Sequence, residues 1–406
     1  MTKISNFKIY LIFLIAVIIR AFSIYHFGDS KIDNEWGIML SNLENYKILS
    51  IRSVEGIPVP NLFMPPLYPI FLYLIKLGIK NVNFFINAVL VIQLILSSIS
   101  IILIFKILLQ IFSKKLSLIG SIVYAFFPLN IYAVSQTSSV VLQVFLINIF
   151  IYCFIKIFKK NKLKNYFLFT LVSALLILLR GEFFVFVLIT LFYLFLKNKN
   201  IAKILLTAIL ILLIISPYLY RNYKIFGEIT VTKSIGFNLL KGNNPNSLVE
   251  GIPLFGQETV IVPQIKDEIF ALKNKTSLNK YDLLIDEIFL KQAIKFIIND
   301  PYTYAALYVK KFASFLLIDL NSTNSNYYSI FHILPKLLIG IFSIIGLIFS
   351  TKLKLNILNY ISLFYISNIG LFSLFFILPR YSLFLLPIQI ILSLEGLKYL
   401  RRKFID

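Results

Sequence analysis

Long runs of apolar residues, separated by short polar stretches, cover most of this chain. The runs are about 20 residues long, which is the length at which an α-helix crosses the hydrocarbon core of a bilayer. A membrane β-barrel would show short segments of alternating polarity instead, and the sequence has no such pattern. The sequence therefore predicts an all-α, polytopic transmembrane helix bundle.

The apolar runs predict about ten spans. The expected spans are residues 9–27, 84–112, 116–133, 140–158 and 204–219, two short spans within 166–196, and three final spans that begin near Ile333, Asn356 and Leu383. Residues 66–77 are apolar but too short to cross comfortably, so we expect an interfacial or re-entrant helix there.

Two stretches interrupt this pattern and divide the chain. Residues 28–64 form a polar first loop. The longer stretch from about 221 to 330 is charge-balanced, and it contains turn signals and a helical segment near 283–298 that Asn299-Asp300-Pro301 should end. Residues 302–320 are expected to form a helix lying on the outer surface. We therefore divide the chain into an N-terminal transmembrane core (1–220) that includes the catalytic loop (28–64), an external loop with surface helices (221–330) and C-terminal transmembrane helices (331–406).

Composition supports a membrane class, because hydrophobic residues make up 59% of the 406 and charged residues only 14%. The net charge of +22 reflects lysines in short loops, such as the five lysines between 156 and 164. Such clusters mark cytoplasmic loops, and together they place both termini in the cytoplasm. Nucleic-acid binding is not expected, since no polar domain is present to offer a basic face.

Thiol and imidazole groups are scarce. Cys153 is the single cysteine and lies in an apolar run, and His26 and His332 are the only histidines. No disulfide, metal site or cofactor is therefore predicted, although a divalent cation is left open. The first apolar segment follows Lys3 and Lys8 and lacks a small-residue cleavage site, so it is expected to be a retained helix.

Ionisable residues gather at the expected external helix ends. They are Asp33, Glu35, Arg180, Glu182, Arg221, Lys241 and Arg380. Helix ends are where charges belong, but a one-sided set also suggests a site. A carboxylate can take a proton from an acceptor, and arginines can bind a phosphate and stabilise its developing charge. Beside a hydrophobic groove, this combination is typical of sugar transfer from a polyprenyl-phosphate donor.

Six short motifs, in order, resemble those of the polytopic C-type (GT-C) glycosyltransferases, most closely the bacterial branch related to protein O-mannosyltransferases and to the lipid A aminoarabinose transferase (family 39-like). They are Asp33-Asn34-Glu35-Trp36-Gly37, Pro65-Pro66-Leu67-Tyr68-Pro69, Leu179-Arg180-Gly181-Glu182, Pro217-Tyr218-Leu219-Tyr220-Arg221-Asn222-Tyr223, Gly242-Asn243-Asn244-Pro245 and Arg380-Tyr381 with Pro387. The family's acidic pair is split here by Asn34, and Gly181 stands where proline is usual.

The resemblance implies a set of roles. A first-loop carboxylate would be the general base, with Glu35 favoured because the residues after it continue like the family's helix, and with Asp33 as the alternate. The donor phosphate would be bound by Arg221, Arg380 and Lys241. Site support would come from Arg180, Glu182, Tyr68, Asn222 and Tyr381. For Arg180 and Glu182 a structural ion pair at a tight turn is the simpler interpretation, and for Tyr68 a rigid loop-to-helix junction.

The implied protein is a glycosyltransferase of the bacterial inner (plasma) membrane. Its partners would be a polyprenyl-phosphate sugar donor, membrane lipid, and a lipid, glycan or protein acceptor at the external face. Two alternatives stay open. One is a transporter or flippase for lipid-linked saccharides, which would call for broken helices and charges near the midplane in both halves. The other is a polymerase or ligase of surface polysaccharide that uses the large external loop.

Overall fold

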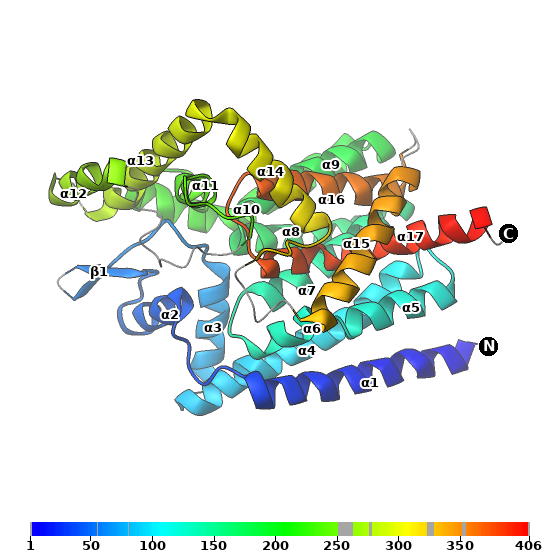
Figure 1. Ribbon diagram of the computed structural model, residues 1–406. Coiled ribbons are helices and arrows are strands. Elements are labelled where there is room, and N and C mark those ends of the chain that lie inside the picture. The colour runs from blue at the N-terminus through cyan, green and yellow to red at the C-terminus, as the bar shows by residue number, and fades with distance from the viewer. Residues whose placement is uncertain are drawn as a thin grey trace.

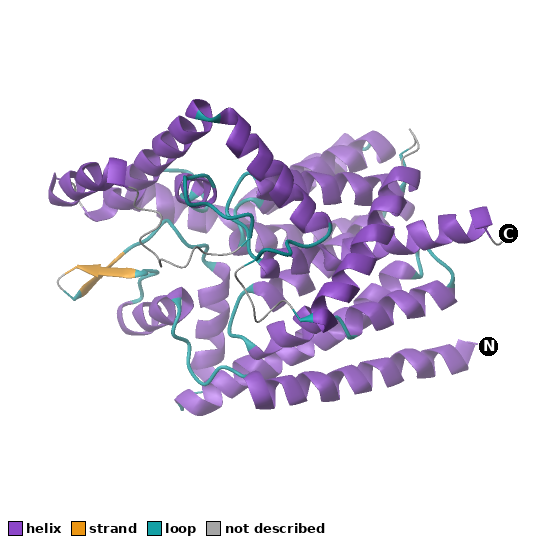
Figure 2. Ribbon diagram, in the orientation of Figure 1, coloured by secondary structure: helices purple, strands orange, loops and turns teal. Residues whose placement is uncertain are grey.

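The computed structural model describes residues 2–54, 56–79, 81–250, 263–275, 278–322, 329–350 and 355–404. Long helices form a bundle, and shorter elements gather at one end of it (Figure 1). Both termini lie at the opposite end. Apart from one small hairpin, the described residues form helices and loops (Figure 2). The expected all-α membrane bundle is thus confirmed, and the hairpin within the first loop is an addition to it.

The bundle and the end layer are built from different elements. The bundle contains α1 (Thr2–Phe27), α4 (Val82–Leu108), α5 (Lys114–Ala125), α6 (Pro128–Tyr132), η1 (Ala133–Ser135), α7 (Val140–Lys159), α8 (Leu163–Leu179), α9 (Phe183–Asn198), α10 (Ile201–Phe226), α15 (Ile330–Ser350), α16 (Ile357–Ser373), η5 (Pro379–Leu385) and α17 (Leu386–Phe404). The end layer contains α2 (Glu35–Tyr46), β1 (Arg52–Val54), β2 (Ile57–Val59), α3 (Leu67–Gly78), α11 (Ile235–Gly242), η3 (Pro263–Ile265), α12 (Lys266–Lys275), α13 (Leu278–Asn299) and α14 (Pro301–Leu316).

Six helices in the described part of the chain are long and apolar enough to cross a membrane, namely Phe7–Phe27, Phe84–Leu108, Val140–Lys159, Ile201–Phe226, Ile330–Phe349 and Pro379–Phe404. The bent pair α5 and α6 with η1 becomes a seventh if it is one span. The expected ten crossings are reached when the shorter apolar helices α8, α9 and α16 are counted as well. The remaining short apolar helix, α3, occupies the segment expected to be interfacial.

The span expected at 116–133 is broken instead of continuous. Helix α5 ends at Ala125, Phe127 is extended, and α6 starts at Pro128 with a bend of 57° between the two pieces. Proline has no N–H to donate and its ring clashes with the preceding turn, so Pro128 favours a break at this point. The sequence predicted a span at 116–133 but not its break, because the partners of the freed backbone groups come from distant helices.

Arg20 supplies one of those partners. Its side chain is fully buried between α1, α4 and α5, where Nη1 donates to the carbonyl of Ala125 at 3.0 Å and Nε donates to Ser97 Oγ at 2.9 Å. The amide of Asn130 similarly donates to the carbonyl of Tyr124 at 3.2 Å. The last carbonyls of a helix lack intrahelical partners and carry partial negative charge, so a buried guanidinium stabilises the end of α5.

One other boundary differs from expectation, and another agrees with it. Helix α10 continues to Phe226, so Arg221 and Asn222 lie inside its last turns instead of following it. The break at Asn299-Asp300-Pro301 is confirmed, because Pro301 opens α14 and the Asp300 carboxylate accepts from the backbone N–H of Thr303 at 3.2 Å. The turn expected at Lys352 and Lys354 lies outside the described residues, as do residues 251–262 and 323–328 of the expected external loop.

We predict that replacing Arg20 with Met destabilises the protein. The carbonyl of Ala125 would lose its partner in a site that water does not reach, a loss of about 1–3 kcal/mol. Thermal unfolding of the purified protein in detergent measures this change. Lys8→Met, which removes an exposed charge from the same helix, is the control. Equal unfolding midpoints for both variants would contradict the role given to Arg20.

Candidate functional site

The first loop is attached to the segment that follows the broken helix. The backbone N–H of Asp29 donates to the carbonyl of Ser135 at 3.0 Å. The carboxylate of Asp29 accepts from both the N–H and the hydroxyl of Thr137, at 2.6 and 2.7 Å. The amide of Asn34 donates to the carbonyl of Thr137 at 3.3 Å. The break in α5 therefore fixes where the loop leaves the membrane.

Gln93 of α4, together with Tyr68 of α3, holds the same segment around residues 134–136. The Gln93 amide donates to the carbonyls of Gln136 and Val134, at 2.9 and 3.3 Å, and it accepts from the Tyr68 hydroxyl at 3.3 Å. The buried ring of Tyr68 meets Trp36 edge-on, with 5.1 Å between ring centroids. The ring of Tyr68 therefore packs against the start of α2, while its hydroxyl binds Gln93 of α4.

The two acids of the first motif have different surroundings. Asn34 caps α2 by accepting from the N–H of Trp36 at 3.0 Å, which makes Glu35 the first helical residue. A carboxylate is favourable there because of the helix dipole. Glu35 is exposed and lies close enough to Lys241 to influence its pKa. Asp33 instead forms an exposed ion pair with Lys31.

Lys241 lies at the end of α11 and is half-buried. Its ammonium sits 4.4 Å from the centroid of the Phe376 ring. Burial lowers the pKa of Lys241; the neighbouring Glu35 opposes that change, and the positive charge of Arg380 adds to it. Arg380 itself is exposed. Among the described residues, neither cation forms an ion pair with a carboxylate.

Close backbone contacts hold α11 in this place. The carboxylate of Asp286 accepts from the N–H groups of Gly236 and Phe237, at 3.1 and 2.9 Å. A Cβ at Gly236 would lie 1.9 Å from the Asp286 carbonyl oxygen, and one at Gly242 would lie 2.5 Å from backbone atoms of residues 375 and 376. The buried ammonium of Lys311 donates to the Gly242 carbonyl at 2.6 Å. Glycine at both ends thus lets α11 fit between α13 and the segment before η5.

Arg180, Glu182 and Tyr381 form a second group. Arg180 pairs with Glu182 at 3.1 Å, and its guanidinium lies 5.0 Å from the centroid of the Tyr381 ring. The guanidinium of Arg380 lies 5.9 Å from the same centroid. A Cβ at Gly181 would lie 3.0 Å from the Thr232 hydroxyl, so glycine lets this turn pack closely against Thr232. Tyr381 therefore lies against both arginines, and Arg180 already has an acidic partner.

Arg221 and Asn222 face the other end of the first loop. Arg221 Nη1 donates to the carbonyl of Asn61 at 3.2 Å and to Asn222 Oδ1 at 2.7 Å. The buried Asn222 amide donates in turn to the carbonyl of Thr230 at 2.7 Å. In the described part of the structure, Arg221 contacts the loop and not Lys241 or Arg380.

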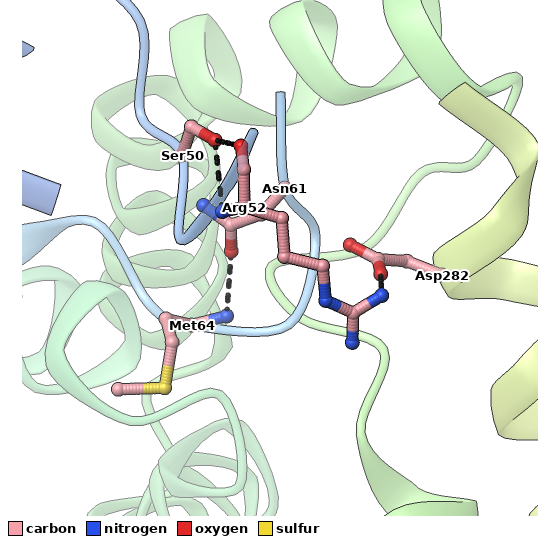
Figure 3. Close-up of polar contacts among 5 residues, drawn as sticks. All are labelled: Ser50, Arg52, Asn61, Met64 and Asp282. Carbon is pink, nitrogen blue, oxygen red and sulfur yellow. Dashed lines mark hydrogen bonds and ion pairs between the residues drawn. The ribbon is translucent and has the colours of Figure 1, made fainter. Parts of the chain in front are cut away.

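Figure 3 shows a further anchor of this loop that the sequence did not reveal. Arg52 Nη1 meets Asp282 Oδ1 of α13 at 2.6 Å. The Ser50 hydroxyl donates to the carbonyl of Arg52 at 2.6 Å, and Asn61 Oδ1 accepts from the N–H of Met64 at 2.9 Å. The loop is thus bound to residues 135–137, to α10 and to α13. Partners 230 positions apart in the chain leave no local signal, so sequence reasoning missed this pair.

In the resulting arrangement the half-buried Lys241 interacts electrostatically with the exposed Glu35 and with Arg380, at the end of the molecule that carries the extramembrane elements. This arrangement can accept a proton through Glu35 and bind an anion through Lys241 and Arg380. No group of three or more His, Cys, Asp or Glu side chains suited to a metal ion occurs among the described residues.

Comparison with known proteins gives a family match to part of the chain and a similar fold for nearly all of it. Residues 64–220 match the family described as dolichyl-phosphate-mannose-protein mannosyltransferase. No curated protein matches the chain in sequence.

The chain is similar in fold to solved structures of the oligosaccharyltransferase AglB from Archaeoglobus fulgidus. One, in complex with an inhibitory peptide and a dolichol-phosphate, is 12% identical, with a TM-score of 0.57 over 98% of this chain and 51% of that chain. Another, tethered to an acceptor peptide containing the NVT sequon, is 13% identical, with a TM-score of 0.59 over 97% and 50%. This chain thus spans about half the length of those proteins. The family match thus covers residues 64–220, and the likeness to the solved structures is one of fold.

We predict that the stability of the protein depends on pH through Lys311. Burial lowers the pKa of Lys311 from 10.5 to about 7. Between pH 7 and 10.5 the unfolded chain keeps a proton that the folded chain has lost, so the free energy of unfolding rises with pH in this window. The unfolding midpoint of the wild type should therefore rise from pH 7 to 9 relative to Lys311→Met.

The exposed neighbour Lys310 provides the control. Lys310→Met should follow the wild-type pH profile, because its ammonium stays in water. If Lys311→Met runs parallel to the wild type as well, the lowered pKa assigned to Lys311 is wrong.

Proposed function

We propose that this chain is a membrane glycosyltransferase that moves a sugar from a polyprenyl-phosphate carrier to an acceptor, on the face where α2 and α11 lie. One observation carries the proposal. Lys241 interacts electrostatically with both Glu35 and Arg380, and neither cation has an ion-pair partner among the described residues.

Two neighbouring cations without acidic partners form a place for an anion. Withdrawing an ammonium from water is costly unless an opposite charge or hydrogen bonds replace the water, and a like charge nearby adds to that cost. The phosphate of a lipid-linked sugar would supply the missing charge to both groups. Its prenyl chain would remain in the bilayer among the apolar helices, so that only the head group reaches the site.

The proposed reaction balances with these residues alone. The acceptor loses its proton to the Glu35 carboxylate as its oxygen or nitrogen forms a bond to the sugar's anomeric carbon. The bond between that carbon and the phosphate oxygen breaks, and the bonding electrons leave with the polyprenyl phosphate. Arg380 and Lys241 stabilise the negative charge that develops on this leaving group. In this scheme Asp33 is the alternate base, and Arg180 with Glu182 braces the site beside Tyr381.

Arg221 has a different part in this scheme. Its hydrogen bond to the Asn61 carbonyl supports a role in setting the end of the first loop. Both hydrogen bonds of Arg221 come from Nη1, so its other N–H groups could make the phosphate contact expected from the sequence. Asn222 and Tyr68 would act by packing and hydrogen bonding, and not by touching the reacting atoms.

The comparisons support the class of donor. The matched family is named for a dolichyl-phosphate sugar donor, and one similar structure contains a dolichol-phosphate and a peptide. Because this chain spans about half of that protein, the acceptor is not carried over. A lipid, a glycan and a protein are all compatible with the proposal.

The lysine clusters suggest an orientation in a bacterial inner membrane. Basic residues are frequent where α4, α7 and α17 end and where α5 and α8 begin, all at the end that carries the termini. By the positive-inside rule this end would face the cytoplasm and the site would face outward.

We predict that Glu35→Gln lowers the rate of sugar transfer by about 10²–10⁴-fold, the usual contribution of a general base. The measurement is transfer from a polyprenyl-phosphate sugar by the purified full chain, with unfolding midpoints as a check of folding. Glu44→Gln, an exposed change on the same helix, should leave the rate unaltered. Asp33→Asn should change it only a few-fold. A strong loss with Asp33→Asn and none with Glu35→Gln would reverse the assignment of the base.

A further inference from the structure

A groove of about 600 Å³ lies far from the candidate site, at the end of the bundle that carries the termini. It is formed by the turn after α4, the first turn of α5 and the last turns of α17. Its floor is apolar and includes Phe112, Leu116 and Leu397. The volume is within the range of about 300–1,000 Å³ that is typical of small-ligand sites.

The rim of this groove is basic. Lys398 and Arg402 line it from α17, and Ser113 lines it just before Lys114-Lys115 opens α5. The ammonium of Lys398 lies 5.8 Å from the centroid of the Phe112 ring and pairs with the Glu395 carboxylate at 3.3 Å, whereas Arg402 forms no ion pair with a carboxylate among the described residues. The Ser113 side chain does not cap α5, and the first N–H groups of a helix favour an anion.

We propose that this groove binds an anionic phospholipid of the surrounding bilayer, with an acyl chain on the apolar floor and the phosphate at the basic rim. Basic pockets between transmembrane helices are suited to such head groups. The end of an acyl chain in this groove would be covered by aliphatic and aromatic side chains. A soluble anion would use the rim but leave the floor exposed. An anionic phospholipid would occupy both the basic rim and the apolar floor. This inference does not depend on the proposed sugar transfer.

The experiment is native mass spectrometry of the full chain, purified in detergent and incubated with phosphatidylglycerol or with phosphatidylcholine. The wild type should retain phosphatidylglycerol in preference to phosphatidylcholine. The double variant Lys398→Gln with Arg402→Gln should bind phosphatidylglycerol roughly tenfold more weakly, because each basic residue near a membrane surface strengthens such binding several-fold. The matched control is Lys160→Gln with Lys162→Gln, which removes two exposed charges from the same end of the molecule.

A second variant tests the floor separately. Leu116→Trp would fill the groove and leave the rim charges in place, so it should also reduce retention of phosphatidylglycerol. Unfolding midpoints close to that of the wild type show that a variant is folded. Equal losses in the groove variant and the control would mean that the basic end attracts anionic lipid without a site, and this would overturn the proposal. Equal retention of phosphatidylglycerol and phosphatidylcholine would overturn it as well.

Discussion

The structure depends on satisfying the backbone groups that are freed where α5 breaks. In a bilayer these groups have no water to bind, so each needs a partner from the protein. Arg20 and Asn130 supply partners to the carbonyls at the end of α5, and Gln93 does the same for the segment after α6. Pro128 favours the break, and these partners satisfy the backbone groups that it frees. The chain thus turns and brings residues 135–137 to the place where α1 ends.

This turn controls the candidate site. Residues 135–137 fix the first loop through Asp29, and Asn34 then sets the first turn of α2 and so the position of Glu35. Lys241 is positioned by the short helix α11, which packs tightly because of Gly236 and Gly242. The carboxylate and the cations thus come from different parts of the chain, and each is held by contacts of its own. The uncompensated positive charge of the cations is the feature from which we infer an anionic donor.

The sequence was informative wherever one segment decided the outcome. Apolar runs located most of the helices, Asn299-Asp300-Pro301 marked a real break, and the residues after Asn34 do form a helix that starts at Glu35. It failed where the outcome depends on partners far away in the chain. Arg20 sits in an apolar run with nothing beside it to reveal its partner 105 positions away. Similarly, Lys310 and Lys311 look alike in sequence, but only Lys311 is buried, because its partner belongs to α11.

The central claim is that the phosphate of a polyprenyl-linked sugar binds between Arg380 and Lys241, within reach of Glu35. The most direct measurement is an experimental structure of the full chain in a lipid nanodisc with a non-hydrolysable polyprenyl-phosphate sugar. We predict phosphate density in contact with both cations and the sugar directed toward Glu35. A phosphate bound elsewhere, with Arg380 and Lys241 left without an anion, would contradict the account.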